Sequence, residues 1–385
     1  MAAPTWDDVR ELIVPRDTPC VSIFMPTHRS GRDTEQDPLR LKNLLKQAEV
    51  DLRALGLRTP EADAVLAPAR DLLGEQPFWR HREDGLALFL RHDWSRVLTL
   101  PYTVAEHLAV GRRFHVRPLL PGLWPDLRFS VLALSQRGTR LFAASRYSFT
   151  EVELPDVPRG MEDVLRYVEN EKQLQAHVAA RRGPSRAGGA VAFHGHGLGR
   201  DVDDERLLEY LRAVDHGVAA AVRDNGAPLV LATLDHVVPL YREVTAVPFV
   251  LDEAVTGSPD KVSDEELHRR AWALVEPRAA REVDELLATY RERAARGGTA
   301  RSLESILRDA RQARVQTLFL AEDEVVWGRF DETSAAVKVH DRRRPGDEDL
   351  LDRAAVETIA TGGLVVCLPR TRMPEESPVA AILRY

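Results

Sequence analysis

The chain alternates short β-rich runs with amphipathic helical stretches, and this alternation restricts its fold more than any other feature. Residues 203–224 carry an apolar stripe close to the helical period, and the turn Asn225-Gly226 ends this predicted helix. The run LVLATL at 229–234 follows, and a short, continuous apolar run is typical of a strand buried on both faces. Helices and strands that alternate in this way predict the α/β class.

We expect this α/β chain to divide into three domains. The predicted boundaries give an N-terminal α/β domain at 1–124, a central domain at 125–275 and a C-terminal α/β sandwich at 276–385. The first boundary lies in a proline-bearing stretch, LLPGLWPDL at 119–127. At about 150 residues per domain, the chain length allows two or three domains, each long enough to bury a core.

β-rich runs and capping signals predict the individual elements of these domains. The runs expected to form strands are CVSIFMP (20–26), GLALFLR (85–91), RVLTLPYTV (96–104), FHVRPLL (114–120), the hairpin FSVLALS with RLFAAS (129–145), two runs in VQTLFLAEDEVVWGRF (315–330), LVVCLP (364–369) and PVAAILRY (378–385). The expected helices are one with Thr5 as N-cap, one with Asp37-Pro38 as cap and first turn, one from Ser302, and those at 61–74, 203–224, 276–296 and 347–360.

Composition and N-terminal sequence indicate a cytoplasmic protein that does not enter the membrane. No apolar run approaches the roughly 18 to 20 residues that a membrane span needs. The stretch MAAPTWDDVRELI carries acids where a signal peptide has basic residues. The two cysteines, Cys20 and Cys367, each lie in an apolar run, so we expect buried, reduced thiols without a metal.

The strongest candidate for chemistry is a basic, glycine-rich loop at 181–200 in the central domain. Because the net charge is −7, any contact with nucleic acid is expected to be local. Six glycines and four arginines, but no acid, lie within 179–200. Glycine lets the backbone approach a ligand closely, and guanidinium groups suit phosphate oxygens. The loop therefore either reaches RNA or is a surface loop with solvated arginines. The candidate RNA-binding residues are Arg181, Arg182, Arg186, Gly188, Gly189, His194, His196 and Arg200.

Two histidines of this loop offer an alternative chemistry. His194 and His196 are two residues apart, so they project to the same side of an extended segment. One of them could act as a general base, or both could bind a metal together with Asp201, Asp203 or Asp204. A His-X-His pattern alone is common and no second ligand cluster accompanies it. We therefore expect no metal and favour a histidine pair in a loop or at a strand end.

A second basic group follows the first predicted strand. The carboxyl ends of strands in α/β units often bind ligands. The alternative is a connection whose hydroxyls cap the next helix and whose charges are solvated. We expect structural roles for single residues and an RNA-binding surface for the group. Its members are Thr27, His28, Arg29, Arg32, Arg40, Lys42 and Lys46.

Signatures of nucleotide-dependent enzymes are absent from the sequence. The chain has no Walker A motif, and the glycines at 195–199 do not fit the dinucleotide-binding spacing. We therefore expect no cofactor. The acidic runs at 201–205 and 264–266 match helix N-termini, where the helix macrodipole favours negative charge.

Several segments, taken in order along the chain, resemble one family. VSIFMPTHR with DPLRLKNLL, FWRHREDGLALFL, RFHVRPLLP and FSVLALSQRGTRLF are similar to the bacterial branch of the archaeo-eukaryotic release factor and Pelota superfamily, which includes Balon-like ribosome hibernation factors. The C-terminal segments VQTLFL, DLLDRAAVETIATGG and VAAILRY are similar to that superfamily's third domain.

The resemblance implies a role for each domain. The N-terminal domain would face the decoding region of the small ribosomal subunit, and the central domain would have an RNase H-like fold. The C-terminal domain would be of the ribosomal-protein-like RNA-binding type and would contact a translational GTPase. True release factors carry Gly-Gly-Gln on the central basic loop. Here Gly188 and Gly189 match the two glycines, but Ala190 stands where the glutamine would be.

We therefore expect a ribosome-associated translation factor that binds the vacant A site, in hibernation or rescue under stress, without enzymatic activity. One alternative is a peptidyl-tRNA hydrolase, or an RNA-cleaving factor, in which His194 or His196 replaces the missing glutamine function. A second alternative is a stress-related protein-binding module that does not bind the ribosome.

Overall fold

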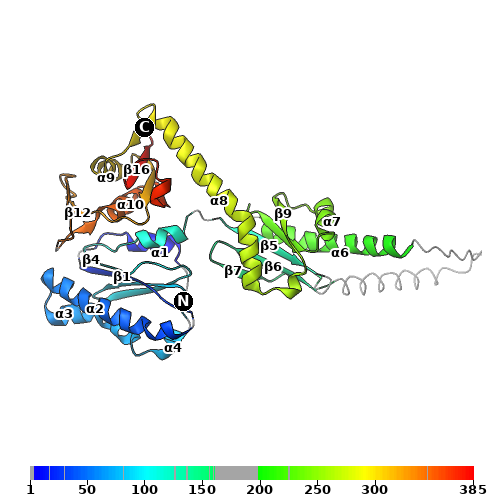
Figure 1. Ribbon diagram of the computed structural model, residues 1–385, viewed down its shortest axis with the longest axis horizontal. Coiled ribbons are helices and arrows are strands. Elements are labelled where there is room, and N and C mark those ends of the chain that lie inside the picture. The colour runs from blue at the N-terminus through cyan, green and yellow to red at the C-terminus, as the bar shows by residue number, and fades with distance from the viewer. Residues whose placement is uncertain are drawn as a thin grey trace, which may run out of the picture. The chain divides into compact units, whose positions relative to one another are not determined.

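The computed structural model confirms the predicted mixed α/β class (Figure 1). It describes residues 4–16, 18–29, 31–80, 82–124, 127–135, 138–155, 157–158, 160, 198–223, 226–344 and 346–385, without the side chains of 32, 33 and 198–205. These described residues form sheets of four, four, three and five strands. The chain groups into two compact units: unit 1 combines residues 1–125 with 281–385, and unit 2 comprises 126–280. The first predicted domain and all but residues 276–280 of the third fall in unit 1, and the division into three domains stays a prediction.

Unit 1 begins with an antiparallel sheet that is buried on both faces. Its strand order is β3-β2-β1-β4. In β1, Val21, Ile23 and Met25 pack on one side, whereas Cys20 and Phe24 pack on the other. Successive side chains of a strand point to opposite faces, so this continuous apolar run supplies two cores. The strands are β1 (Cys20–Pro26), β2 (Gly85–Arg91), β3 (Trp94–Leu100) and β4 (His107–Gly111).

Two long helices cover one face of this sheet, as Figure 1 shows for α2 and α3. The N-cap predicted at Thr5 is confirmed for helix α1. The Thr5 hydroxyl accepts the Asp8 N–H at 3.2 Å, and the Asp8 carboxylate accepts the Thr5 N–H at 2.9 Å. The helices of this part are α1 (Trp6–Leu12), α2 (Asp37–Ala54), α3 (Thr59–Leu72) and α4 (Gln76–Arg80), with the 3₁₀ turns η1 (Arg32–Glu35) and η2 (Arg117–Gly122).

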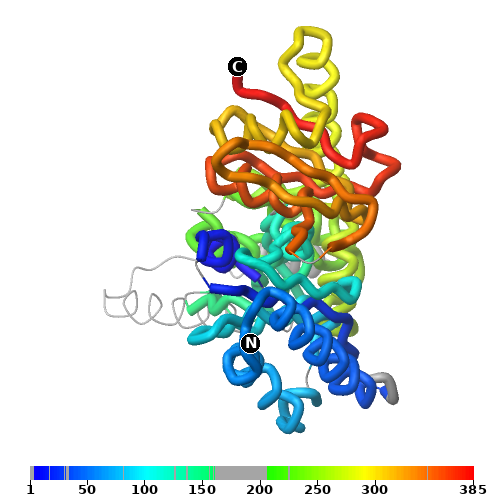
Figure 2. Tube along the Cα trace, turned by 90° about the vertical axis from the view of Figure 1, so that its left-hand side faces the viewer, coloured from blue at the N-terminus to red at the C-terminus, as the bar shows by residue number. Residues whose placement is uncertain are grey.

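The C-terminal part of unit 1 holds a sheet with helices on both faces, and Figure 2 shows this part, in orange and red, against the blue and cyan N-terminal part. The sheet order is β10-β16-β11-β15, and β13-β12-β14 form a smaller sheet. Helices α9 and α10 pack on one face, and the second half of α8 packs on the other. The elements are α8 (Asp264–Ala294), β10 (Thr299–Ala300), α9 (Leu303–Arg311), β11 (Val315–Ala321), β12 (Trp327–Phe330), β13 (Val337–Val339), β14 (Glu348–Asp349), α10 (Leu350–Ala360), β15 (Leu364–Leu368), η4 (Arg370–Arg372) and β16 (Val379–Leu383).

Three predicted helix starts are wrong, and the helix expected from 203 begins at Leu198. Helix α8 begins at Asp264 instead of 276, because apolar residues continue at helical spacing through the added segment. Those residues are buried in the core of unit 2: Leu267, Ala271 and Val275. Helix α10 begins at Leu350 instead of 347, because Asp349 pairs within β14 and caps the helix by accepting the Leu351 N–H.

Unit 2 is built on the sheet β7-β6-β5-β8-β9. Strands β5 and β6 form the predicted hairpin, whereas β5, β8 and β9 run parallel. Every residue of β8 is buried, as its continuous apolar run predicts: Leu229 and Leu231 pack with helix α6, and Val230 and Ala232 pack with α8. The elements are β5 (Phe129–Leu134), β6 (Thr139–Ala144), β7 (Phe149–Val152), α6 (Leu198–Val222), β8 (Leu229–Thr233), α7 (Val237–Val244), β9 (Val250–Thr256) and η3 (Pro259–Lys261).

A buried carboxylate joins the two parts of unit 1. Asp352 of α10 accepts the backbone N–H groups of Val116 at 2.8 Å and of Arg117 at 2.7 Å through the same Oδ1. The Arg117 side chain is also buried, donates to the Ala321 carbonyl at 3.0 Å and lies 3.1 Å from Asp349 Oδ2. Burial raises the pKa of Asp352 to about 6. Since buried charges persist only when they are paired and hydrogen-bonded, the two parts depend on each other.

The same contacts explain why the strand expected at 114–120 is wrong. The edge strand beside β1 is β4, which was not predicted, and η2 takes up much of the expected run. Pro118 and Pro121 lack the N–H groups that a strand ladder needs. The preceding N–H groups donate to side chains instead, as that of His115 does to Ser22 Oγ at 2.9 Å.

Two histidine rings, tilted by 33° to each other, lie in contact beside this network. The ring centroids of His107, in β4, and His115 are 4.3 Å apart. Burial lowers the pKa of His115 to about 4, against the opposing effect of Asp349. Burial, together with the nearby His115, Arg117 and Arg343, lowers the pKa of His107 to about 3. Both imidazoles are therefore neutral at pH 7.

We predict that Asp352→Ala lowers the free energy of unfolding by about 3 kcal/mol, because it leaves two buried N–H groups without an acceptor. Urea unfolding measures this change. Asp284→Ala is the matched control, since Asp284 forms an exposed ion pair with Arg372 at 2.7 Å. An exposed pair contributes at most about 1 kcal/mol. Equal effects of the two substitutions would contradict the role given to Asp352.

We also predict that His107→Gln reduces the loss of stability on acidification. The unfolded imidazole takes up a proton near pH 6.5, whereas the folded one does not until about pH 3. The neutral His107 imidazole therefore makes its full contribution to the free energy of unfolding above pH 6.5, and this contribution is lost as the pH falls below 6.5. When the pH falls from 7.5 to 5, the variant should therefore lose about 2 kcal/mol less of its free energy of unfolding than the unsubstituted protein loses. His92→Gln, at an exposed position, should leave the profile unchanged.

Candidate nucleic-acid interface

The basic group predicted at 27–46 lies where β1 ends and α2 begins. Its first member, Thr27, is only 4% exposed. Its hydroxyl donates to the Glu83 carbonyl at 2.7 Å, and its N–H donates to the Asp84 carbonyl at 3.1 Å. Thr27 therefore connects the end of β1 to the segment before β2.

His28 is held by the first residue of α2. The Asp37 carboxylate accepts the His28 N–H at 3.0 Å and lies 2.9 Å from the His28 Nδ1. The Asp37 side chain is fully buried, whereas 37% of the His28 side chain is exposed. The prediction that Asp37 caps its own helix is wrong: Gln36 takes the N-cap position, without a side-chain cap bond. The carboxylate orders the preceding loop instead.

The two described arginines of the group are paired with acids. Arg29 lies 2.8 Å from Glu83 and 2.9 Å from Asp84. Arg40 lies 3.8 Å from Asp37 and 3.5 Å from Glu106, and it donates to the Pro26 carbonyl at 3.1 Å. These pairings offset much of the positive charge that the sequence suggests for this surface. Asp37 belongs to α2, whereas the other three acids come from the segments before β2 and β4. The basic residues alone did not indicate these partners.

Lys42 and Lys46 keep their charge exposed. They are four residues apart on α2, so they lie on one face of the helix. Neither lysine forms an ion pair with the residues that the structure describes. Arg32 lies in η1, and its side chain is not among those described. Within this group, the exposed lysine pair is therefore the described part available to an anionic partner.

The basic loop of the central domain lies mostly outside the described residues. This holds for Arg181, Arg182, Arg186, Gly188, Gly189, His194 and His196, whose RNA-binding role stays a prediction. The predicted loop extends to 200, but α6 begins at Leu198, so its last three residues are helical. The acids at 201–205 favour an early start because they lie near the positive end of the helix dipole. Arg200 therefore lies in the first turn of helix α6.

The described residues offer no metal site of three or more His, Cys, Asp or Glu side chains. Both cysteines are free thiols; Cys20 is buried and Cys367 is half-buried. Burial raises the pKa of Cys20 to about 11 and that of Cys367 to about 12, so both are protonated at pH 7. In the described ranges, no helix has both the length and the apolar character that crossing a membrane requires.

One family model matches part of the chain. The sequence model of bacterial archaeo-eukaryotic release factor family 3 matches residues 128–314. A search of curated proteins finds no match to the chain.

Several solved structures are similar at low identity. The archaeal translation termination factor aRF1 is 12% identical, with 98% of this chain and 96% of that chain covered and a TM-score of 0.25. Pelota from Archaeoglobus fulgidus is 14% identical, with coverages of 78% and 79% and a TM-score of 0.28. A ribosome-bound archaeal Pelota, from an assembly with ABCE1, is 12% identical, with coverages of 100% and 95% and a TM-score of 0.35. The family match over residues 128–314 confirms the predicted resemblance to the bacterial branch of the archaeo-eukaryotic release factor and Pelota superfamily.

Proposed function

We propose that this protein is a ribosome-associated translation factor that occupies the vacant A site of idle or stalled ribosomes without hydrolysing peptidyl-tRNA. The observation that carries the proposal is the release factor family match over residues 128–314, a range that includes the basic loop at 181–200. In this loop Ala190 replaces the glutamine of true release factors. A methyl side chain cannot order an attacking water, which favours occupancy over hydrolysis.

Two cationic surfaces would supply the RNA contacts. One is the exposed pair Lys42 and Lys46 on α2, which would face the small subunit, and the other is the loop with Arg181 and Arg182. Contacts to phosphates add up independently of sequence and weaken with salt, because each one releases counterions. Folded RNA is recognised largely by its shape and backbone. Because the net charge of the chain is −7, its contacts with RNA would be confined to such local cationic surfaces.

The remaining parts of the proposal concern the central and C-terminal regions. In unit 2, an antiparallel trio, β7-β6-β5, is extended by two parallel strands, and this order supports the RNase H-like assignment. Residues 276–385 would contact a translational GTPase. We place the protein in the cytoplasm, where its proposed partner is found.

The proposal predicts that the purified protein co-sediments with vacant 70S ribosomes at low salt. Lys42→Glu with Lys46→Glu should weaken binding and flatten its salt dependence, as should Arg181→Glu with Arg182→Glu. For every phosphate that a variant no longer binds, the slope of log K against log salt should fall by roughly 0.7 to 0.9. Sedimentation at several salt concentrations measures both quantities.

Lys261→Glu with Lys338→Glu is the matched control, since it changes the charge equally at exposed positions outside both surfaces. Its binding should equal that of the unsubstituted protein. A protein that stays at the top of the gradient would contradict ribosome binding and favour a protein-binding module. Equally weakened binding in all three variants would show that net charge, and not these surfaces, determines binding.

The proposal also predicts no release of peptide from a stalled ribosome complex above background. A release assay with labelled peptidyl-tRNA measures this. Release that disappears in a His194→Ala, His196→Ala variant would overturn the non-enzymatic proposal and support histidine general-base catalysis, which contributes about 10² to 10⁴ in rate.

A further inference from the structure

A cleft of about 390 Å³ lies in unit 1, where its N-terminal and C-terminal parts meet. Helix α2 and the β4 region line one side, and β12 with the loop at 341–344 lines the other. Its volume lies within the usual range for small-ligand sites. The lining side chains that could contact a ligand are Asn43, Gln47, Glu106, His107, Trp327 and Arg343.

Flat rings lie on both sides of the cleft, His107 in β4 and Trp327 in β12. The rings of Trp327 and His107 are almost parallel, at 7°, with centroids 6.2 Å apart. The guanidinium carbon of Arg343 lies 5.1 Å from the Trp327 ring centroid. The His107 Nε2 is buried without a hydrogen-bond partner among the described residues. Aromatic and guanidinium planes are the surfaces on which proteins stack unpaired bases.

Hydrogen bonds hold the polar rim of the cleft in place. The Asp51 carboxylate accepts the Gln47 Nε2 at 2.9 Å through one oxygen and the Arg343 Nη2 at 3.0 Å through the other. Gln47 is thereby left with its carbonyl oxygen and one N–H for a ligand. Asn43, one turn earlier on the same helix, adds a second exposed amide.

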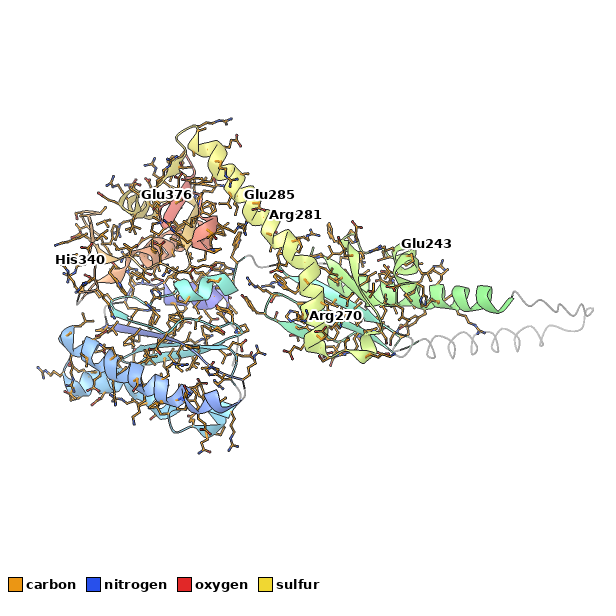
Figure 3. All side chains as sticks on the ribbon, viewed as in Figure 1. Glu243, Arg270, Arg281, Glu285, His340 and Glu376 are labelled. Carbon is orange, nitrogen blue, oxygen red and sulfur yellow. The ribbon has the colours of Figure 1, made fainter. Side chains whose placement is uncertain are left out.

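The loop that carries Arg343 is fixed at both ends. His340, labelled in Figure 3, donates its N–H to the Trp327 carbonyl at 2.8 Å, and its Nδ1 lies 2.8 Å from Asp347. The same Asp347 carboxylate accepts the Arg344 N–H at 2.9 Å. The cleft is therefore formed before any ligand arrives, which lowers the entropic cost of binding.

We propose that this cleft binds an unstacked purine base, with adenine preferred. The base stacks along the Trp327 and Arg343 planes, and the amides of Asn43 and Gln47 contact its edge. Asn and Gln side chains pair with N6 and N7 of adenine, and a pyrimidine lacks this edge. A free nucleotide and an unpaired RNA base share this chemistry, so the inference goes beyond ribosome binding.

Calorimetric titration of the full-length protein with AMP, CMP and a five-residue oligoadenylate tests the proposal. AMP and oligoadenylate should bind, and CMP should bind at least about fivefold more weakly. Trp327→Ala should weaken AMP binding about tenfold, and Trp327→Phe should weaken it less, because a smaller ring still stacks. Asn43→Ala and Gln47→Ala should reduce the preference for AMP over CMP.

Gln316→Ala is the matched control, because it removes an exposed amide outside the cleft and should change no affinity. Asn43 and Gln47 are exposed, so their variants keep the test valid even if Trp327→Ala fails to fold. Equal affinities for AMP and oligoadenylate would identify a free-nucleotide site. Tighter, salt-dependent binding of oligoadenylate would identify an RNA-base site.

Absence of binding by AMP and oligoadenylate at millimolar concentration would overturn the proposal. Affinities that the Asn43 and Gln47 variants leave unchanged would overturn it as well. Because the titration contains no ribosomes, such failure would leave the proposed A-site function standing, and failure of co-sedimentation would leave the cleft standing.

Discussion

The carboxylate of Asp352 is the interaction on which unit 1 depends. It accepts two buried N–H groups from a segment about 236 positions away in the chain, beside a buried arginine and a buried histidine. The backbone there cannot continue as a strand because prolines interrupt it, so a side chain provides the acceptor that a neighbouring strand would otherwise supply. One core then contains residues of both parts, among them Phe24 and Leu350. The N-terminal sheet and the C-terminal helices therefore form one compact unit despite their separation in sequence.

Acidic residues decide which cations of the candidate interface remain exposed. Glu83 and Asp84 hold Arg29, and Asp37 and Glu106 lie close to Arg40. These arginines order the loop between β1 and α2 and contribute less free charge than their number suggests. The lysines of α2 lie on the exposed face of the same helix and have no such partners within the described ranges. A chain with excess negative charge can thus present a local cationic surface on a rigid element.

The cleft beside Trp327 is a consequence of the same junction. Helix α2 supplies its amides from the N-terminal part, and β12 with the loop after His340 supplies its rings and guanidinium from the C-terminal part. Neither part alone contains all of the side chains that line the cleft. Asp51 and Asp347, one from each part, hold the rim through hydrogen bonds. The hydrogen bonds of Asp352, which join the two parts of unit 1, therefore also bring together the residues of the proposed ligand site.

Local sequence was sufficient to predict the α/β class, most strands and the presence of most helices, although not every helix start. The run CVSIFMP, the hairpin at 129–145, the cap at Thr5 and the helix from Ser302 depend on neighbouring residues, and all appear as expected. It also identified the basic residues of the candidate site. The folded chain alone reveals the edge strand β4, the turn in place of a strand at 114–120, and the acids that pair with Arg29 and Arg40. These features depend on hydrogen bonds and ion pairs between residues far apart in the chain, which local periodicity and propensity do not encode.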